Sequence, residues 1–310
     1  MTQIMDQYNN KEDIKKKKIL LKTFQAFIDF CKKYHLTYFG AYGTCLGAIR
    51  HKGFIPWDDD IDVCMPRKDY EKVIALREKL QGTGYELFKF GDSSVDAGIY
   101  TISFLKFCDA NTTIWERESM PCIFGVFVDI FPLDEVGNKD IANILSTKYK
   151  KAIFHYYLSI RDWRFKDLIK AIKNHSIHQT LSFFFNAMIR KFRKKHYLKL
   201  SQSLEQKIKE QKGDKLAYYG WGSSFDRETF PKSLLENLIE VPFENIKIVV
   251  PANYDFYLRQ QYKDWQTPPP IEQRVSHHYL YFQDLSKRWT IRNVKKLHLP
   301  EEKNITYIAD

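Results

Sequence analysis

The chain has 310 residues, 44% of them hydrophobic and 28% charged, with a net charge of +11. This size and composition exclude a wholly disordered chain and a small disulfide-stapled domain, and they allow one large domain with a buried core. The five cysteines form no Cys-x-x-Cys pair and the polar N-terminus lacks the apolar stretch of a secretory signal, so we expect a cytoplasmic protein with reduced thiols.

The first half of the chain is predicted to alternate helices with short strands. Apolar residues recur at helical spacing from Lys11 to His35, which indicates an amphipathic helix. The elements expected next are a strand over 38–42, a helix from Thr44 to Arg50 with Thr44 as its N-cap, a loop over 51–59, a strand from Asp60 to Met65, a helix from Pro66 to Leu80, and strands over 84–90, 98–108 and 122–131.

The second half begins with a segment whose pattern is helical, basic and rich in aromatic residues. Short strands are expected within 241–250 and a helix from Tyr254 to Tyr262, whereas the polar tail after Ser286 is expected to pack loosely. The predicted division is a catalytic core that begins in 1–138, a helical insertion over 139–211, and a part over 212–310 that completes the catalytic domain.

The positive charge is concentrated within the insertion. Residues 148–199 hold fourteen Lys/Arg and only two acids, so the rest of the chain is almost neutral. Aromatic residues such as Trp163, Phe185 and Tyr197 interleave with these bases. Two interpretations are open: peripheral contact with anionic lipid at the inner face of the cell membrane, or a solvated basic face over an ordinary helical core.

The paired acids Asp60 and Asp62 are the first candidates for chemistry. Residues two apart on a strand face the same side, so the two carboxylates would lie together while Ile61 and Val63 point into the core. Neighbouring carboxylates repel each other unless a cation lies between them, and oxygen ligands of this kind suit Mg²⁺ or Mn²⁺. The pattern predicts a metal site, although a lone Asp-x-Asp is a weak signal.

A third acid, Asp129, interrupts the apolar run from Phe124 to Phe131. A charge in such a run is costly unless it lies at an exposed edge or is paired. If this strand lies beside the Asp60–Asp62 strand, three carboxylates converge on one or two metal ions, which is an arrangement suited to phosphoryl transfer. Asp129 is predicted to act either as a metal ligand or as the base toward an acceptor hydroxyl.

Residues near these acids are suited to phosphate. Gly43 and Thr44 stand between a predicted strand and helix, where glycine lets a phosphate approach the backbone and a helix N-terminus offers free N–H groups. Arg50 and Lys52 follow and would neutralise phosphate charge, and Asp59 adds negative charge beside the metal-binding pair. Each residue also has a simpler interpretation as a turn, a cap or a surface charge.

Three motifs together resemble one protein family. The run from Gly43 to Glu71, GTCLGAIRHKGFIPWDDDIDVCMPRKDYE, closely resembles the signature of the LicD family, which includes bacterial phosphocholine transferases and relatives of the fukutin type. VDIFPLD at 128–134 resembles its second motif, and VPANYDFYLRQQYKDWQTPPP at 250–270 resembles its third. One departure is Lys263, which stands where the family often has glycine.

The resemblance implies an α+β fold with a nucleotidyltransferase-like mixed sheet flanked by helices and a basic helical insertion. It also implies transfer of a phospho-alcohol group, such as phosphocholine, from a CDP-alcohol donor to a hydroxyl of a cell-surface glycan or lipid-linked glycan, with release of CMP. The family's metal-binding carboxylates map onto Asp60, Asp62 and Asp129. Donor contacts are expected at Gly43, Thr44, Arg50, Arg274, His277 and His278.

Two other classes of function are open from the residues alone. A nucleotidyltransferase that moves NMP from an NTP would release pyrophosphate instead of CMP. A basic nucleic-acid-binding protein fits the net charge, but the charge is confined to one segment, and the acids of 58–62 would repel phosphate without a metal. We therefore expect no nucleic acid partner. A glycosyltransferase is disfavoured because no Rossmann-like nucleotide-binding half is recognisable.

Overall fold

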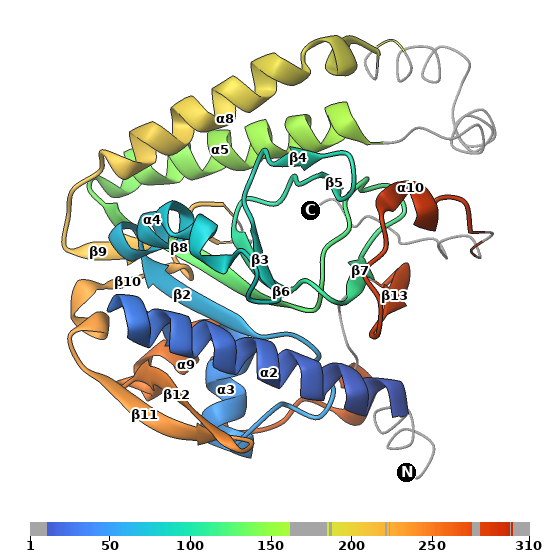
Figure 1. Ribbon diagram of the computed structural model, residues 1–310. Helices are drawn as coiled ribbons and strands as arrows, with labels where there is room; N and C mark the ends of the chain where they lie inside the picture. Colours follow the sequence, from blue (N-terminus) through green and yellow to red (C-terminus); the bar gives the residue numbers. More distant parts are fainter. Residues whose placement is uncertain are drawn as a thin grey trace.

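The computed structural model describes residues 11–161, 185, 188–220, 222, 224–274, 280–297 and 299 (Figure 1). The helices are α2 (Lys11–Tyr34), α3 (Tyr42–His51), α4 (Arg67–Ala75), α5 (Lys139–Ile160), α8 (Lys194–Lys209), α9 (Tyr254–Tyr262) and α10 (Ile291–Val294), with 3-10 turns η1 (Arg77–Leu80), η2 (Lys232–Leu235) and η3 (Ile271–Gln273). The strands are β1 (Phe39–Gly40), β2 (Asp62–Pro66), β3 (Tyr85–Phe88), β4 (Ser93–Ser94), β5 (Gly98–Ile99), β6 (Leu105–Asp109), β7 (Thr113–Trp115), β8 (Phe127–Val136), β9 (Lys215–Ala217), β10 (Thr229–Pro231), β11 (Leu238–Phe243), β12 (Ile246–Pro251) and β13 (Phe282–Asp284).

The centre of the described molecule is a mixed sheet of seven strands. Its main path runs β1-β2-β8-β6-β3, in which β2 and β8 are parallel and the other neighbours are antiparallel. The long strand β8 is almost entirely buried; it pairs first with β2 and β6, and near its end with β9, which continues to β10. The predicted mixed sheet flanked by helices is therefore confirmed.

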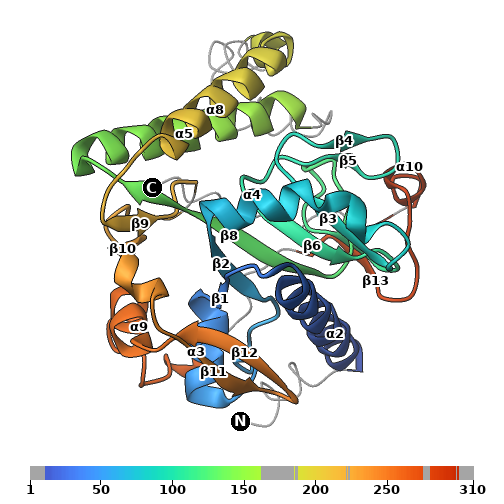
Figure 2. The ribbon, with the colours of Figure 1, turned by 60° about the vertical axis from the view of Figure 1, so that its left-hand side comes forward.

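Helices α2 and α4 lie in front of the sheet, on one of its faces (Figure 2). Phe27 and Phe30 of α2 pack against Phe107 of β6, with ring centroids 5.7 and 6.1 Å apart. Because successive residues of a strand point to opposite faces, Lys106 points away from α2. The register pairs Lys106 with Asp129 of β8, which places Asp129 on that same opposite face.

Helices α5 and α8 form a pair beside the sheet (Figures 1 and 2). They bury a smaller core of their own against β9, with Tyr149, Leu204 and Tyr219 among its members. Residues 162–184, which the sequence analysis assigns to the basic insertion, lie outside the described residues. The division at 138 and 211 therefore stays a prediction.

Three predicted boundaries near the acids differ from the structure. Strand β2 begins at Asp62, so Asp60, predicted as the first residue of the strand, lies just before it. Helix α3 begins at Tyr42 with Ala41 as its N-cap, so Thr44 lies within the first turn and does not cap it. The hydroxyl of Thr44 instead accepts a hydrogen bond from the backbone N–H of Asp62, at 2.8 Å. Strand β8 begins at Phe127, later than predicted, and extends to Val136 because its second half gains β9 as a partner far away in sequence.

Two other expectations were also wrong. The strand predicted over 98–108 is two short strands, β5 and β6, and only β6 joins the central sheet. The tail after Ser286 is not loosely packed where it is described, because Ile291 and Val294 of α10 are buried in a small core with Trp115 and Ile123. A four-residue helix with two apolar positions is too short to reveal itself by periodicity.

The five cysteines lie in the interior of the protein. All five cysteines carry free, buried thiols, as expected. Burial raises the pKa of each thiol above its ordinary value, so these side chains fill the core and do not supply nucleophiles. Within the described part of the chain, no helix has both the length and the apolarity needed to cross a bilayer.

Candidate functional site

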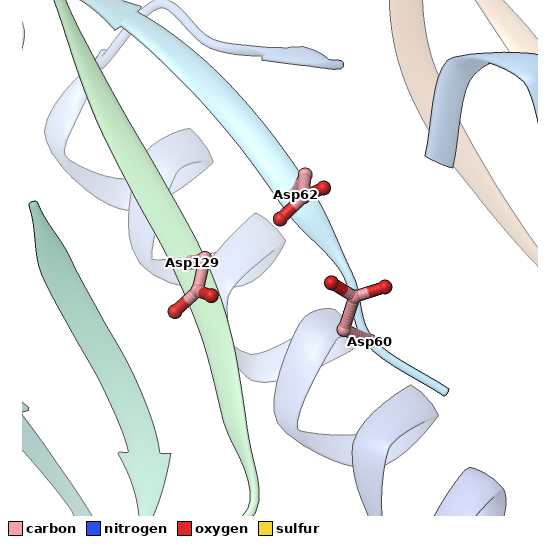
Figure 3. Close-up of side chains that lie close together, drawn as sticks. All are labelled: Asp60, Asp62 and Asp129. Atoms are coloured by element: carbon pink, nitrogen blue, oxygen red, sulfur yellow. The ribbon is translucent and has the colours of Figure 1, made fainter. Parts of the chain in front are cut away.

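The three predicted acids lie together on the sheet face opposite α2 (Figure 3). Strands β2 and β8 run parallel in a register that sets Asp62 directly beside Asp129, and Asp60 lies just before β2. Each of the three offers a carboxylate oxygen, and these oxygens all lie within 4.8 Å of one another. The sequence predicted that the three acids would meet if their strands lay side by side, and the parallel pairing of β2 and β8 meets that condition.

The sheet also holds a cation beside these acids that the sequence analysis missed. Lys106 of β6 is only 1% exposed, and its Nζ lies 2.7 Å from Oδ1 of Asp129 and 3.2 Å from Oε1 of Glu116. Asp62, Asp129 and Lys106 therefore form one row across three neighbouring strands. The signal was present in the sequence, since Lys106 interrupts the apolar run FLKFC just as Asp129 interrupts its own.

Burial and charge act in opposite directions on this pair. Burial is the largest influence on Asp129 and raises the pKa of its carboxyl to about 7, while the ammonium of Lys106 opposes the rise and Glu116 adds to it. Burial alone would lower the pKa of Lys106, but the charges of Asp129 and Glu116 outweigh it and raise that pKa above the ordinary value. Lys106 therefore carries its positive charge beside the acids.

The donor set suits a hard divalent cation. Asp60 and Asp62 are half-buried and Asp129 is buried, so all three carboxylates are partly withdrawn from water while they remain close together. Three carboxylates against one ammonium group leave an excess of negative charge that Mg²⁺ or Mn²⁺ would neutralise with oxygen ligands. These residues fit the predicted metal.

Gly43 and Thr44 hold the acidic segment against the start of α3. Glycine at 43 lets the carboxylate of Asp58 lie against the start of α3, and a larger residue there would require that carboxylate to shift. Thr44 is buried and fixes the backbone of Asp62 through its hydroxyl. Both residues therefore position the acids, and their predicted contact with donor phosphate stays a prediction.

Two arginines predicted to bind the donor lie near each other. The Nη1 of Arg50 donates to the carbonyl oxygen of Trp265 at 2.7 Å, and the guanidinium of Arg274 lies 5.2 Å from the ring centroid of Trp57. Burial lowers the pKa of Arg50, and the positive charge of Arg274 acts in the same direction, whereas Tyr262 opposes both. Two guanidinium groups in one neighbourhood form a place that favours anions.

The other residues that were predicted to bind the substrate do not all lie at the acidic site. Asp59 makes an ion pair with Lys16 of α2, at 2.6 Å, which anchors the acidic segment to that helix. Lys52 is exposed and ends α3 in a left-handed conformation, with φ of 64°. His277 and His278 lie outside the described residues. The structure thus pairs the carboxylate of Asp59 with α2 and leaves Lys52 on the surface.

Comparisons with known proteins include the acidic part of this site. The sequence profile described as LicD/FKTN/FKRP, nucleotidyltransferase domain, matches residues 35–158, which include the three acids and Lys106. The lipopolysaccharide cholinephosphotransferase LicD of Haemophilus influenzae is 30% identical over 267 residues, which cover 84% of this chain and 93% of that protein. The similarity therefore extends well beyond the acidic motifs.

Proposed function

Because the chain belongs to the LicD family and is a phosphotransferase of that type, we propose that it moves a phospho-alcohol group from a CDP-activated donor to a hydroxyl of a cell-surface glycan, with release of CMP. The relative from Haemophilus is by name a cholinephosphotransferase for lipopolysaccharide, which makes phosphocholine the first alcohol to test. The observation that carries the proposal is the convergence of Asp60, Asp62 and Asp129 on one sheet face.

The chemistry proposed for these residues is positioning and charge neutralisation. A divalent cation held by the three carboxylates would offset negative charge on the donor diphosphate during transfer. Asp60 and Asp62 would hold the cation, and the backbone of Asp62 is kept in place by Thr44. Asp129 would either complete this ligand set or accept the proton of the acceptor hydroxyl, and both roles use the same buried carboxylate.

A donor screen tests the proposal. The purified protein with Mg²⁺ is incubated with CDP-choline, CDP-glycerol or CDP-ribitol and an acceptor glycan, and CMP is quantified by chromatography. CMP formed from at least one donor in an acceptor-dependent way supports the proposal. Pyrophosphate formed from an NTP, with no CMP from any CDP-alcohol, would instead assign the site to nucleotidyl transfer.

Arg50 is expected to act on donor binding. Replacing it with methionine removes a charge near Arg274, and we expect the KM for the CDP-alcohol to rise about tenfold, as for the loss of one charged hydrogen bond, with kcat changed less. Steady-state kinetics measures both constants. Arg259→Met is the matched control, since Arg259 is exposed and pairs with Asp255 within α9. An unchanged KM would remove Arg50 from the donor site.

The proposed location is the cytoplasm, at the inner face of the cell membrane. In the described part of the basic segment, exposed apolar side chains such as Phe154, Met188 and Phe192 stand among lysines and arginines. Phe192 is 84% exposed, so most of its ring is open to solvent or to a lipid phase. Apolar groups surrounded by positive charge suit the interface of an anionic bilayer.

Vesicle co-sedimentation tests this location. We expect binding to vesicles that contain phosphatidylglycerol but not to pure phosphatidylcholine, and we expect salt to weaken it. Changing Lys191, Lys194 and Lys195 to glutamine should weaken binding by about 1 kcal/mol per charge. Phe192→Ser should also weaken it, whereas Val95→Ser, at a site 88% exposed outside the segment, should not. Absence of salt-sensitive binding would favour the solvated basic face.

A further inference from the structure

Lys106 is held on several sides in a part of the sheet that is otherwise apolar. Its ammonium bonds to Asp129 and Glu116, and it lies 3.2 Å from the ring centroid of Phe127 and 5.0 Å from that of Phe124. The side chain is 2% exposed, so water does not compete for it. An ammonium fixed by two carboxylates and by aromatic faces has little freedom to move.

The ammonium of Lys106 engages one of the two oxygens of the Asp129 carboxylate. The hydrogen bond from Lys106 is made to Oδ1. One oxygen of the carboxylate is therefore engaged on the β6 side, whereas Asp60 and Asp62 lie on the β2 side of β8 (Figure 3). The side chain of Asp129 thus lies between the ammonium of Lys106 on one side and the carboxylates of Asp60 and Asp62 on the other.

We propose that Lys106 is a positioning residue for the transfer reaction, a role that rests on the proposed function. By donating to Oδ1, Lys106 takes up one lone pair of the Asp129 carboxylate and holds that carboxylate in one orientation beside Asp60 and Asp62. By its charge, it also offsets part of the negative charge of the surrounding carboxylates, Glu116 included. The lysine thus sets how Asp129 approaches a divalent cation or an acceptor hydroxyl, without itself touching the substrate.

The proposal predicts opposite effects on cation binding and on turnover. Without the ammonium, no fixed positive charge opposes a divalent cation and both oxygens of Asp129 are available. At a pH at which Asp129 is ionised, a divalent cation should therefore bind as tightly as before or more tightly. The carboxylate is then no longer held in its orientation, and small displacements of a catalytic group are costly to the rate. A residue needed only for folding would weaken cation binding and turnover together.

The experiment compares Lys106→Met and Lys106→Gln with the unaltered protein. Mn²⁺ affinity is measured without substrate by electron paramagnetic resonance, and kcat and donor KM are measured at saturating Mn²⁺. We expect Lys106→Met to bind Mn²⁺ equally or up to about tenfold more tightly, and to lose about 10- to 100-fold in kcat with little change in KM. Lys106→Gln, which keeps a hydrogen-bond donor of similar length, should recover part of kcat.

Controls separate the possible failures. Lys89→Met removes an exposed lysine just beyond β3 and should change neither quantity. Weaker Mn²⁺ binding in Lys106→Met, unchanged kcat, or failure of both variants to show cooperative thermal unfolding would overturn the positioning role. If the unaltered protein releases no CMP from any donor, the proposed function fails, while the Mn²⁺ comparison still reports on how Lys106 shapes the acidic site.

Discussion

Replacing Asp62 with asparagine is expected to lower CMP release at least about 1000-fold at saturating donor, because a metal ligand contributes several kcal/mol to transition-state stabilisation. Asparagine keeps the shape of the side chain but removes its negative charge. The backbone N–H of Asp62, which donates to Thr44, is untouched by the change, so the acidic segment should keep its conformation. Initial rates of CMP formation with Mg²⁺ measure the loss.

The fold of this variant must be shown to persist. A far-ultraviolet circular dichroism spectrum and a thermal transition like those of the unaltered protein would exclude unfolding as the cause. Asp226→Asn is the matched control, since Asp226 lies on the surface in an exposed pair with Lys139, and its rate should be unchanged. A rate within tenfold of normal for Asp62→Asn would contradict the assignment of Asp62 as a ligand.

Replacing Arg67 with methionine is expected to lower the free energy of unfolding by about 3–5 kcal/mol, as is usual when one partner of a buried ion pair is removed. Arg67, the first residue of α4, binds Asp134 of β8 through two parallel hydrogen bonds of 2.6 and 2.8 Å. It also contacts Glu205 of α8 at 3.1 Å. Asp134 is 2% exposed, so methionine would leave a buried carboxylate without its main cation. Urea denaturation at neutral pH measures the change.

A second substitution tests whether the unpaired carboxylate of Asp134 causes the loss of stability. Adding Asp134→Asn to Arg67→Met removes the unpaired carboxylate, and the double variant should recover part of the lost stability. Lys32→Met breaks the exposed, 3.9 Å pair with Glu240 and should leave the unfolding transition almost unchanged. If the double variant is less stable than Arg67→Met, the unpaired carboxylate of Asp134 is not the cause of the lost stability.

The features that the sequence predicted correctly are local or carried by the family motifs. The α2 periodicity matched the observed helix to within one residue, and Tyr254–Tyr262 matched α9 at both ends. The carboxylates of Asp60 and Asp62 lie together, as their spacing of two residues suggested, although Asp60 lies just before β2. The membership of the family followed from contiguous runs such as Gly43 to Glu71.

The errors share a different cause, which is partners that are distant in sequence. The extra length of β8 depends on β9, about eighty residues later, and the burial of Val294 depends on Trp115. Thr44 was expected to cap a helix, but its hydroxyl is used by the backbone of Asp62. A hydroxyl that can either cap its own helix or accept a hydrogen bond from a distant backbone N–H cannot be assigned without knowledge of its neighbours in space.

By itself, the sequence determined the family, the identity of the three acids and the chemistry to which carboxylates at that spacing are suited. The tertiary structure alone decided that β2 and β8 run parallel in the register that joins Asp62 to Asp129. It also placed Lys106 opposite Asp129 from an antiparallel strand. The physical reason is that strand register is set by burial and pairing across the whole sheet, so no local pattern reveals which charges become neighbours.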